Sequence, residues 1–231
     1  MKAIKKALAV AAIAAAPVAA QAVEVSGNVT LATDYSFRGV TQTDNKGAIQ
    51  GGFDVASESG VYAGIWASNV NFGTDTSTEM DYYIGWAGDI AEGVSIDLGY
   101  IYFDYEGDSE FDYQEFAVSL GMGDFTIGVN YSDEYLGDGG PDFLYPYVDY
   151  SLSLPEDFAL DFHVGYNDMD EEGLIEADED SYTDWSITLS KSFSGLDFAL
   201  AYVDTTIDDL FGTGSDEGAD GRVIFSISKS L

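Results

Sequence analysis

The 231-residue sequence contains no cysteine and a single histidine, His163. The absence of cysteine excludes disulfide bonds, thiolate metal sites and lipoprotein acylation. Basic residues are also scarce, since eight Lys and Arg stand against 42 Asp and Glu, for a formal net charge of −34. A charge of this sign and size repels nucleic acid, so no nucleic-acid partner is expected.

Long apolar runs are confined to the start of the chain. Three lysines in the first six residues precede an Ala-rich apolar stretch, Leu8–Val18, which is too short to span a bilayer as a helix. Ala20-Gln21-Ala22 has the small-residue pattern of a signal-peptidase site. We predict that residues 1–22 are a cleaved signal peptide, the alternative being a retained anchor, and that residues 23–231 form one exported domain.

The polar and apolar residues of that domain alternate with a period of two. From Val23 to Phe37 the odd positions are mostly apolar or aromatic and the even positions mostly polar. Fifteen alternating residues exceed the usual strand of a soluble sheet, which has about 5–6. A long strand with one apolar and one polar side suits a wall with lipid outside and water inside.

The same alternation recurs along the chain and predicts twelve strands. They cover residues 23–37, 47–57, 61–72, 80–88, 94–105, 112–120, 125–132, 143–154, 158–167, 182–191, 196–203 and 221–231. Tight turns alternate with longer polar connections, as in outer-membrane barrels. The predicted fold is therefore all-β, a transmembrane antiparallel up-and-down β-barrel of about 12 strands; the alternative is a soluble β-sandwich with shorter strands.

Acidic residues on the predicted strands share the parity of the polar face, except Asp104. The predicted lining of the interior consists of Asp34, Asp54, Asp81, Asp97, Glu115, Asp149, Asp161, His163, Asp184 and Asp197. Arg38 and Arg222 are expected at the loop rim. Unpaired buried carboxylates are costly, so this interior should be wet and attract cations. The alternative is that the acidity is a general property of a salt-adapted source.

No catalytic, cofactor or metal site is expected. His163 lies beside Asp161 on the inward face, and a dyad with Ser151 or Ser186 would face away from membrane lipid. The acidic stretch Asp168–Asp180 lacks the ligand spacing of a calcium loop. We therefore predict that the chain is not an enzyme.

Several segments carry a family resemblance. Val25-Ser-Gly-Asn-Val-Thr-Leu-Ala-Thr-Asp-Tyr-Ser-Phe-Arg-Gly-Val-Thr-Gln-Thr43, followed by Ile49-Gln-Gly-Gly-Phe53, resembles the opening of the TorF-like family of proposed porins of proteobacteria. Later parts of the family are similar to Tyr62–Asn69, Asp97–Tyr102, His163–Tyr166 and Val223–Lys229. The resemblance implies an outer-membrane β-barrel with channel function, and no enzymatic residues.

These features predict an outer-membrane channel, in contact with membrane lipid, for passive diffusion of small hydrophilic solutes and with a preference for cations. Twelve strands enclose an interior between that of eight- and sixteen-stranded barrels, so we expect a narrow pore that the long loops constrict. An oligomer is possible. The main alternative is a closed structural or surface-interaction barrel with loops that bind divalent ions; a soluble periplasmic binding protein is the third hypothesis.

Overall fold

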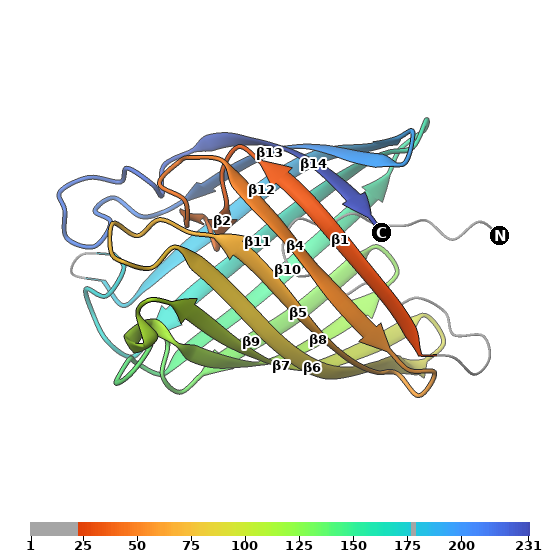
Figure 1. Ribbon diagram of the computed structural model, residues 1–231, viewed down its shortest axis with the longest axis horizontal. Coiled ribbons are helices and arrows are strands. Elements are labelled where there is room, and N and C mark those ends of the chain that lie inside the picture. The colour runs from red at the N-terminus through yellow and green to blue at the C-terminus, as the bar shows by residue number, and fades with distance from the viewer. Residues whose placement is uncertain (1–22, 177–178) are drawn as a thin grey trace.

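Twelve antiparallel strands close into a barrel in the computed structural model, which describes residues 23–176 and 179–231 (Figure 1). The predicted signal peptide lies outside the described residues. The barrel strands are β1 (Glu24–Ala32), β4 (Ala48–Ala56), β5 (Val61–Asn69), β6 (Thr78–Ala91), β7 (Val94–Glu106), β8 (Tyr113–Met122), β9 (Phe125–Ser132), β10 (Phe143–Ser153), β11 (Phe158–Met169), β12 (Ser181–Phe193), β13 (Leu196–Thr205) and β14 (Arg222–Ser230). This confirms the predicted fold class.

The first and last strands close the barrel. β1 pairs with β14, with Asn28 opposite Ser230 at one end and Ala32 opposite Ser226 at the other. Every other pair joins two barrel strands that follow one another along the chain. Tight turns lie at one rim with the end of β14, and the longer loops lie at the other (Figure 1). Each barrel strand therefore has a partner on both sides, as a closed wall requires.

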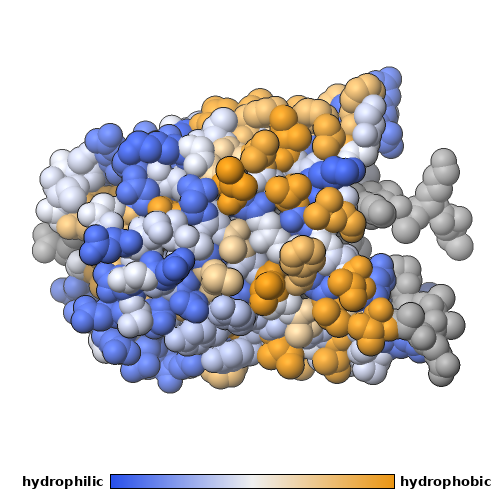
Figure 2. Space-filling model, viewed as in Figure 1, coloured by the Kyte–Doolittle hydropathy of each residue, from blue (hydrophilic) through white to orange (hydrophobic). Residues whose placement is uncertain are grey.

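The alternation read from the sequence places apolar side chains on the outer surface. On β1, Val25, Val29 and Leu31 are exposed, whereas Asn28 and Thr30 are partly buried. Figure 2 shows that apolar side chains gather on the half of the visible wall nearer the tight turns, while the half that carries the long loops is mostly polar. An apolar belt is what a barrel wall needs where it meets lipid.

Among the described residues, no helix is long and apolar enough to cross a membrane. The only helical element described is a single 3₁₀ turn, η1 (Ser109–Phe111), in the loop between β7 and β8.

The first strand is shorter than predicted. β1 ends at Ala32 rather than Phe37, because the chain from Thr33 to Lys46 leaves the wall and folds into the barrel. This segment, called the first loop below, contains the two-residue strands β2 (Ser36–Phe37) and β3 (Val40–Thr41), which pair with each other.

Candidate functional site in the barrel lumen

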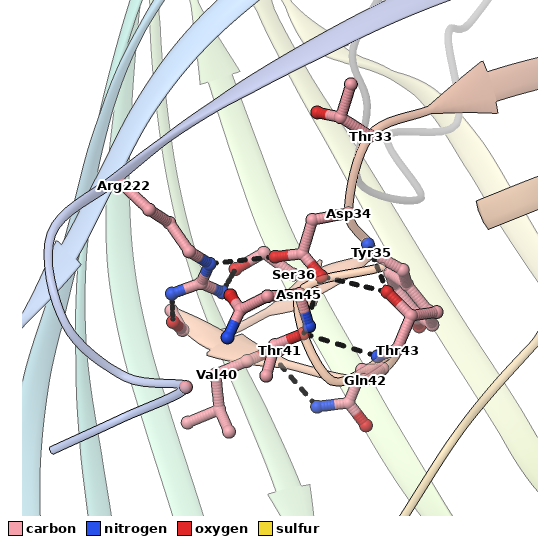
Figure 3. A network of polar contacts seen from close by, with 12 residues as sticks. Thr33, Asp34, Tyr35, Ser36, Val40, Thr41, Gln42, Thr43, Asn45 and Arg222 are labelled. Atoms are coloured by element: carbon pink, nitrogen blue, oxygen red, sulfur yellow. Dashed lines mark hydrogen bonds and ion pairs between the residues drawn. The ribbon is translucent and has the colours of Figure 1, made fainter. Parts of the chain in front are cut away.

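The first loop is organised around the carboxylate of Asp34, which is 6% exposed (Figure 3). Its Oδ1 accepts hydrogen bonds from the hydroxyls of Thr41, at 2.5 Å, and Thr43, at 2.8 Å. Its Oδ2 accepts one from Nε of Arg222 at 2.7 Å. Arg222 also donates to the carbonyl of Gly39 at 2.9 Å, so the first residue of β14 holds both the start and the turn of the loop.

The turn of the loop places Arg38 inside the barrel. Its guanidinium donates two hydrogen bonds of 2.7 Å to the two carboxylate oxygens of Glu115 on β8. Both side chains are buried, with exposed fractions of 4% and 1%. Burial lowers the pKa of Arg38, but the charge and hydrogen bonds of Glu115, together with Tyr135 and Tyr113, raise it more, so the net shift is upward and the guanidinium stays charged.

This ion pair crosses the lumen. The first loop connects β1 and β4, and β8 lies five strands from β1 in one direction around the ring and seven in the other. The Tyr35 hydroxyl also donates to Glu79 on β6 at 2.8 Å, and the Tyr182 hydroxyl of β12 donates to the carbonyl of Arg38 at 3.2 Å. Contacts with such distant parts of the wall make the loop a plug. The structure therefore corrects the expected position of Arg38, which is buried inside the barrel and not at the open rim.

An apolar core fills the lumen on the long-loop side. Its buried members are Val40, Phe103, Tyr105, Tyr113, Tyr135, Phe143, Tyr145, Met169, Ile175, Tyr182, Ile207, Leu210 and Ala219. Several rings stack, as in the Tyr135–Phe143 pair with centroids 3.8 Å apart and the Phe103–Tyr113 pair at 4.4 Å. Five of the buried members are tyrosines, so tyrosine rings form much of the core that holds the plug.

Two long loops extend this core over the rim. Ile175 lies in the loop between β11 and β12, and Ile207 and Leu210 follow β13. The buried carboxylate of Glu176 joins the two loops by accepting hydrogen bonds from the backbone N–H groups of Asp208, at 2.7 Å, and Asp209, at 3.3 Å. Tyr135 lies in the loop between β9 and β10 and belongs to the same core. Burial raises the pKa of Tyr135 to about 12, so its phenol is neutral there.

The lumen nearer the tight turns has a different chemistry. Tyr83 of β6 donates a short hydrogen bond to Asp54, and Tyr62 of β5 donates one of 2.6 Å to Asp97. The three carboxylates Asp54, Asp97 and Asp161 are all partly exposed to solvent. Phenols rather than cations therefore partner Asp54 and Asp97.

Glycines on neighbouring strands make room for these phenols. Gly64 of β5 stands directly opposite Tyr83 of β6, and a Cβ at Gly64 would lie 2.3 Å from the Tyr83 hydroxyl. A ring lying over a glycine of the next strand is a recurrent way to cover backbone that has no side chain. Gly64 and Tyr83 thus position the Asp54 contact.

The imidazole of His163 contacts two carboxylates, those of Asp149 and Asp184, where the acidic part of the lumen meets the apolar core. Its Nδ1 lies 2.6 Å from Asp149 and its Nε2 lies 3.1 Å from Asp184 and 2.7 Å from the Tyr145 hydroxyl. Asp184 is buried and also accepts from Asn167 at 2.8 Å. Both ring nitrogens face acceptors, an arrangement that a protonated imidazole satisfies by donating from both.

The structure thus divides the predicted lining residues into two groups. Asp34, Asp81, Glu115 and Asp184 are buried, and all but Asp81 are bonded to the plug or to the residues around it. Partly exposed members are Asp54, Asp97, Asp149, Asp161, His163 and Asp197. Arg222 is the first residue of β14. A role for these residues in ion passage stays a prediction.

Glu79 was missed because it was assigned to a loop. β6 begins at Thr78, so Glu79 lies on the strand with the inward parity of Asp81 and is 1% exposed. Extending the alternation back by two residues from Asp81 is the signal that would have found it. The inward aromatic residues were missed because the more apolar face of each strand was expected to point outward. β7 and β10 carry large rings on both faces, so this criterion does not separate the faces there.

The sequence matches a family model over residues 16–231, and the family is described as a bacterial protein of unknown function (Gcw_chp). The chain belongs to this family. None of the curated proteins matches it.

Solved structures share the fold. The KdgM porin aligns with a TM-score of 0.58 and 8% identity over 89% of this chain and 99% of that chain. The NanC porin aligns with a TM-score of 0.52 and 14% identity over 90% of this chain and 98% of that chain. At these identities the likeness concerns the fold, and it makes this family member a porin-like barrel.

Proposed function

We propose that the chain is an outer-membrane channel for small hydrophilic solutes, with a preference for cations. The closed barrel, its apolar belt and its likeness to two porins support a membrane channel. The resemblance of Val25–Thr43 to the TorF-like family of proposed porins supports the same assignment. A cleaved signal peptide over residues 1–22 would deliver the chain to that membrane.

The observation that carries the cation preference is the imbalance of charge in the lumen. In residues 23–176 and 179–231, the lumen ion pairs join Arg38, His163 and Arg222 to Asp34, Glu115, Asp149 and Asp184. The carboxylates of Asp54, Asp97, Asp161 and Asp197 form no ion pair within those residues. Rings of carboxylates attract cations and repel anions, so the part of the lumen nearer the tight turns favours cations.

The plug sets how much such a channel conducts. The first loop and the apolar core close the long-loop half in this conformation, so passage requires the loop to move or leaves only a narrow path beside it. The same packing favours a second candidate, a closed barrel that acts through its surface loops. The two candidates differ in whether the barrel conducts once the plug is removed.

Planar-bilayer recordings of the wild type and of a variant with residues 33–46 replaced by a short Gly-Ser linker test the proposal. We expect small or rare openings in the wild type and a larger, cation-selective conductance in the variant. A correctly folded variant that does not conduct would exclude the channel and leave the closed barrel. Heat-modifiable migration on a gel checks that the variant has folded.

A further inference from the structure

The guanidinium of Arg38 is enclosed by aromatic rings. Its Cζ lies 4.4 Å from the ring centroid of Tyr145, 4.6 Å from Phe143, 4.5 Å from Phe37 and 5.7 Å from Tyr135. A cation within about 6 Å of a ring centroid is attracted by the negative face of the ring, most strongly when both are out of water. Four rings around one cation form an aromatic cage.

The cage also has a polar end that selects for shape. The Glu115 carboxylate takes two parallel hydrogen bonds from the guanidinium, and Asn130 on β9 donates to Glu115 at 2.9 Å and holds it in place. This planar, two-pronged contact fits a guanidinium, whereas an ammonium is a compact charge that cannot form both bonds in one plane. The site therefore discriminates between two cations of equal charge.

The cage ring of Phe37 lies next to Arg38 in the first loop, and that of Tyr135 lies in the loop between β9 and β10, whereas the rest of the site comes from the barrel wall. Glu115, Asn130, Phe143 and Tyr145 come from the consecutive wall strands β8, β9 and β10, which are paired independently of the first loop. Arg38 comes from the loop, and its backbone has φ +48°, a region that residues with a Cβ seldom adopt. The wall can thus keep the site when the loop withdraws.

We infer that Glu115, Asn130, Phe143 and Tyr145 form a binding site for guanidinium and alkylguanidinium cations, which Arg38 occupies here as a tethered ligand. A solute that carries this group competes with Arg38, and its binding releases the plug. That the bound cation is also a transported solute rests on the proposed channel function. The binding itself does not.

Calorimetric titration of the full-length Arg38→Ala variant in detergent with methylguanidinium tests the inference. The variant should bind methylguanidinium at least about tenfold more tightly than methylammonium. The wild type, whose site is filled, should bind it weakly. If Arg38→Ala does not fold alone, the refolding yield with methylguanidinium against methylammonium gives the same comparison.

Two matched variants complete the test. Arg38→Ala/Glu115→Gln keeps the rings and loses the carboxylate, so it should lose the preference for methylguanidinium. Lys46→Ala removes another cation of the first loop, which is exposed and pairs with Asp44, and should gain no binding. Equal affinity for the two cations in Arg38→Ala, or unchanged affinity in the double variant, would overturn the site. Because calorimetry needs no conductance, a barrel that binds methylguanidinium but never conducts would contradict the channel alone.

Discussion

The ion pair between Arg38 and Glu115 joins residues 77 positions apart, both of them almost fully buried. Removing two charges from water is costly, and the pair survives because its geometry is bidentate and both groups have further partners. Breaking such a pair leaves one charge without compensation. The Arg38–Glu115 pair is therefore expected to contribute strongly to holding the first loop inside the barrel.

Glu115→Ala should lower the free energy of unfolding by about 3–5 kcal/mol, since it leaves the Arg38 guanidinium buried without its carboxylate. Urea unfolding of the detergent-solubilised barrel measures this. The double variant Arg38→Ala/Glu115→Ala should lose less than the sum of the two single variants, because no lone charge remains. Additivity within about 0.5 kcal/mol would show that the pair is not coupled.

Gly64→Ala should destabilise the barrel by about 1–3 kcal/mol, because the added Cβ would meet the Tyr83 hydroxyl at 2.3 Å and displace it from Asp54. Gly99→Ala on β7 is the matched control. The nearest atom to its added Cβ is the Tyr62 hydroxyl at 3.4 Å, which is near ordinary contact. Equal stability of the two variants in thermal unfolding would disprove the role given to Gly64.

At the scale of elements, all twelve strands could be predicted because lipid outside and a polar interior impose the alternation on each. The end of β1 could not. The alternation runs on through Tyr35 and Phe37, but these rings belong to a loop that turns inward and packs in the lumen. A short hairpin inside a barrel and a longer wall strand show the same period, and only the contacts across the lumen separate them.

Pro146 illustrates how a local rule was overridden. Proline disfavours a central strand position, yet the alternation over residues 143–154 predicts a strand that contains it. The structure places Pro146 on the outer face of β10, opposite Val129 of β9. Pairing with β11 stops at Leu144 and resumes at Tyr147, so the ladder tolerates the missing N–H by leaving a gap.

Gly39→Ala should loosen the first loop. Gly39 has φ +82°, and an added Cβ would lie 2.2 Å from Thr205 on β13. We expect faster hydrogen exchange of the amides in residues 33–46 and more frequent channel opening. Gly47→Ala, at the other end of the loop, meets its nearest atom at 3.6 Å and should leave exchange unchanged. Equal exchange in the two variants would show that the turn does not hold the plug.

At the scale of the whole molecule, the inward parity of the acidic residues was predictable because a charge facing lipid at mid-depth is costly. Their partners were not, since Tyr62, Tyr83 and His163 reach them across neighbouring strands. The inward parity of the acidic residues predicts a wet and acidic interior throughout. The structure keeps that chemistry nearer the tight turns and replaces it with a packed aromatic core on the long-loop side.

The reversal potential of the barrel with the shortened first loop, in a planar bilayer under a potassium chloride gradient, tests the central proposal most directly. Cation selectivity is predicted, and Asp97→Asn/Asp161→Asn in the same background should weaken it, because both carboxylates are partly exposed to the lumen without an ion pair among the described residues. A folded barrel that conducts nothing, or one whose reversal potential shows anion selectivity, would contradict it.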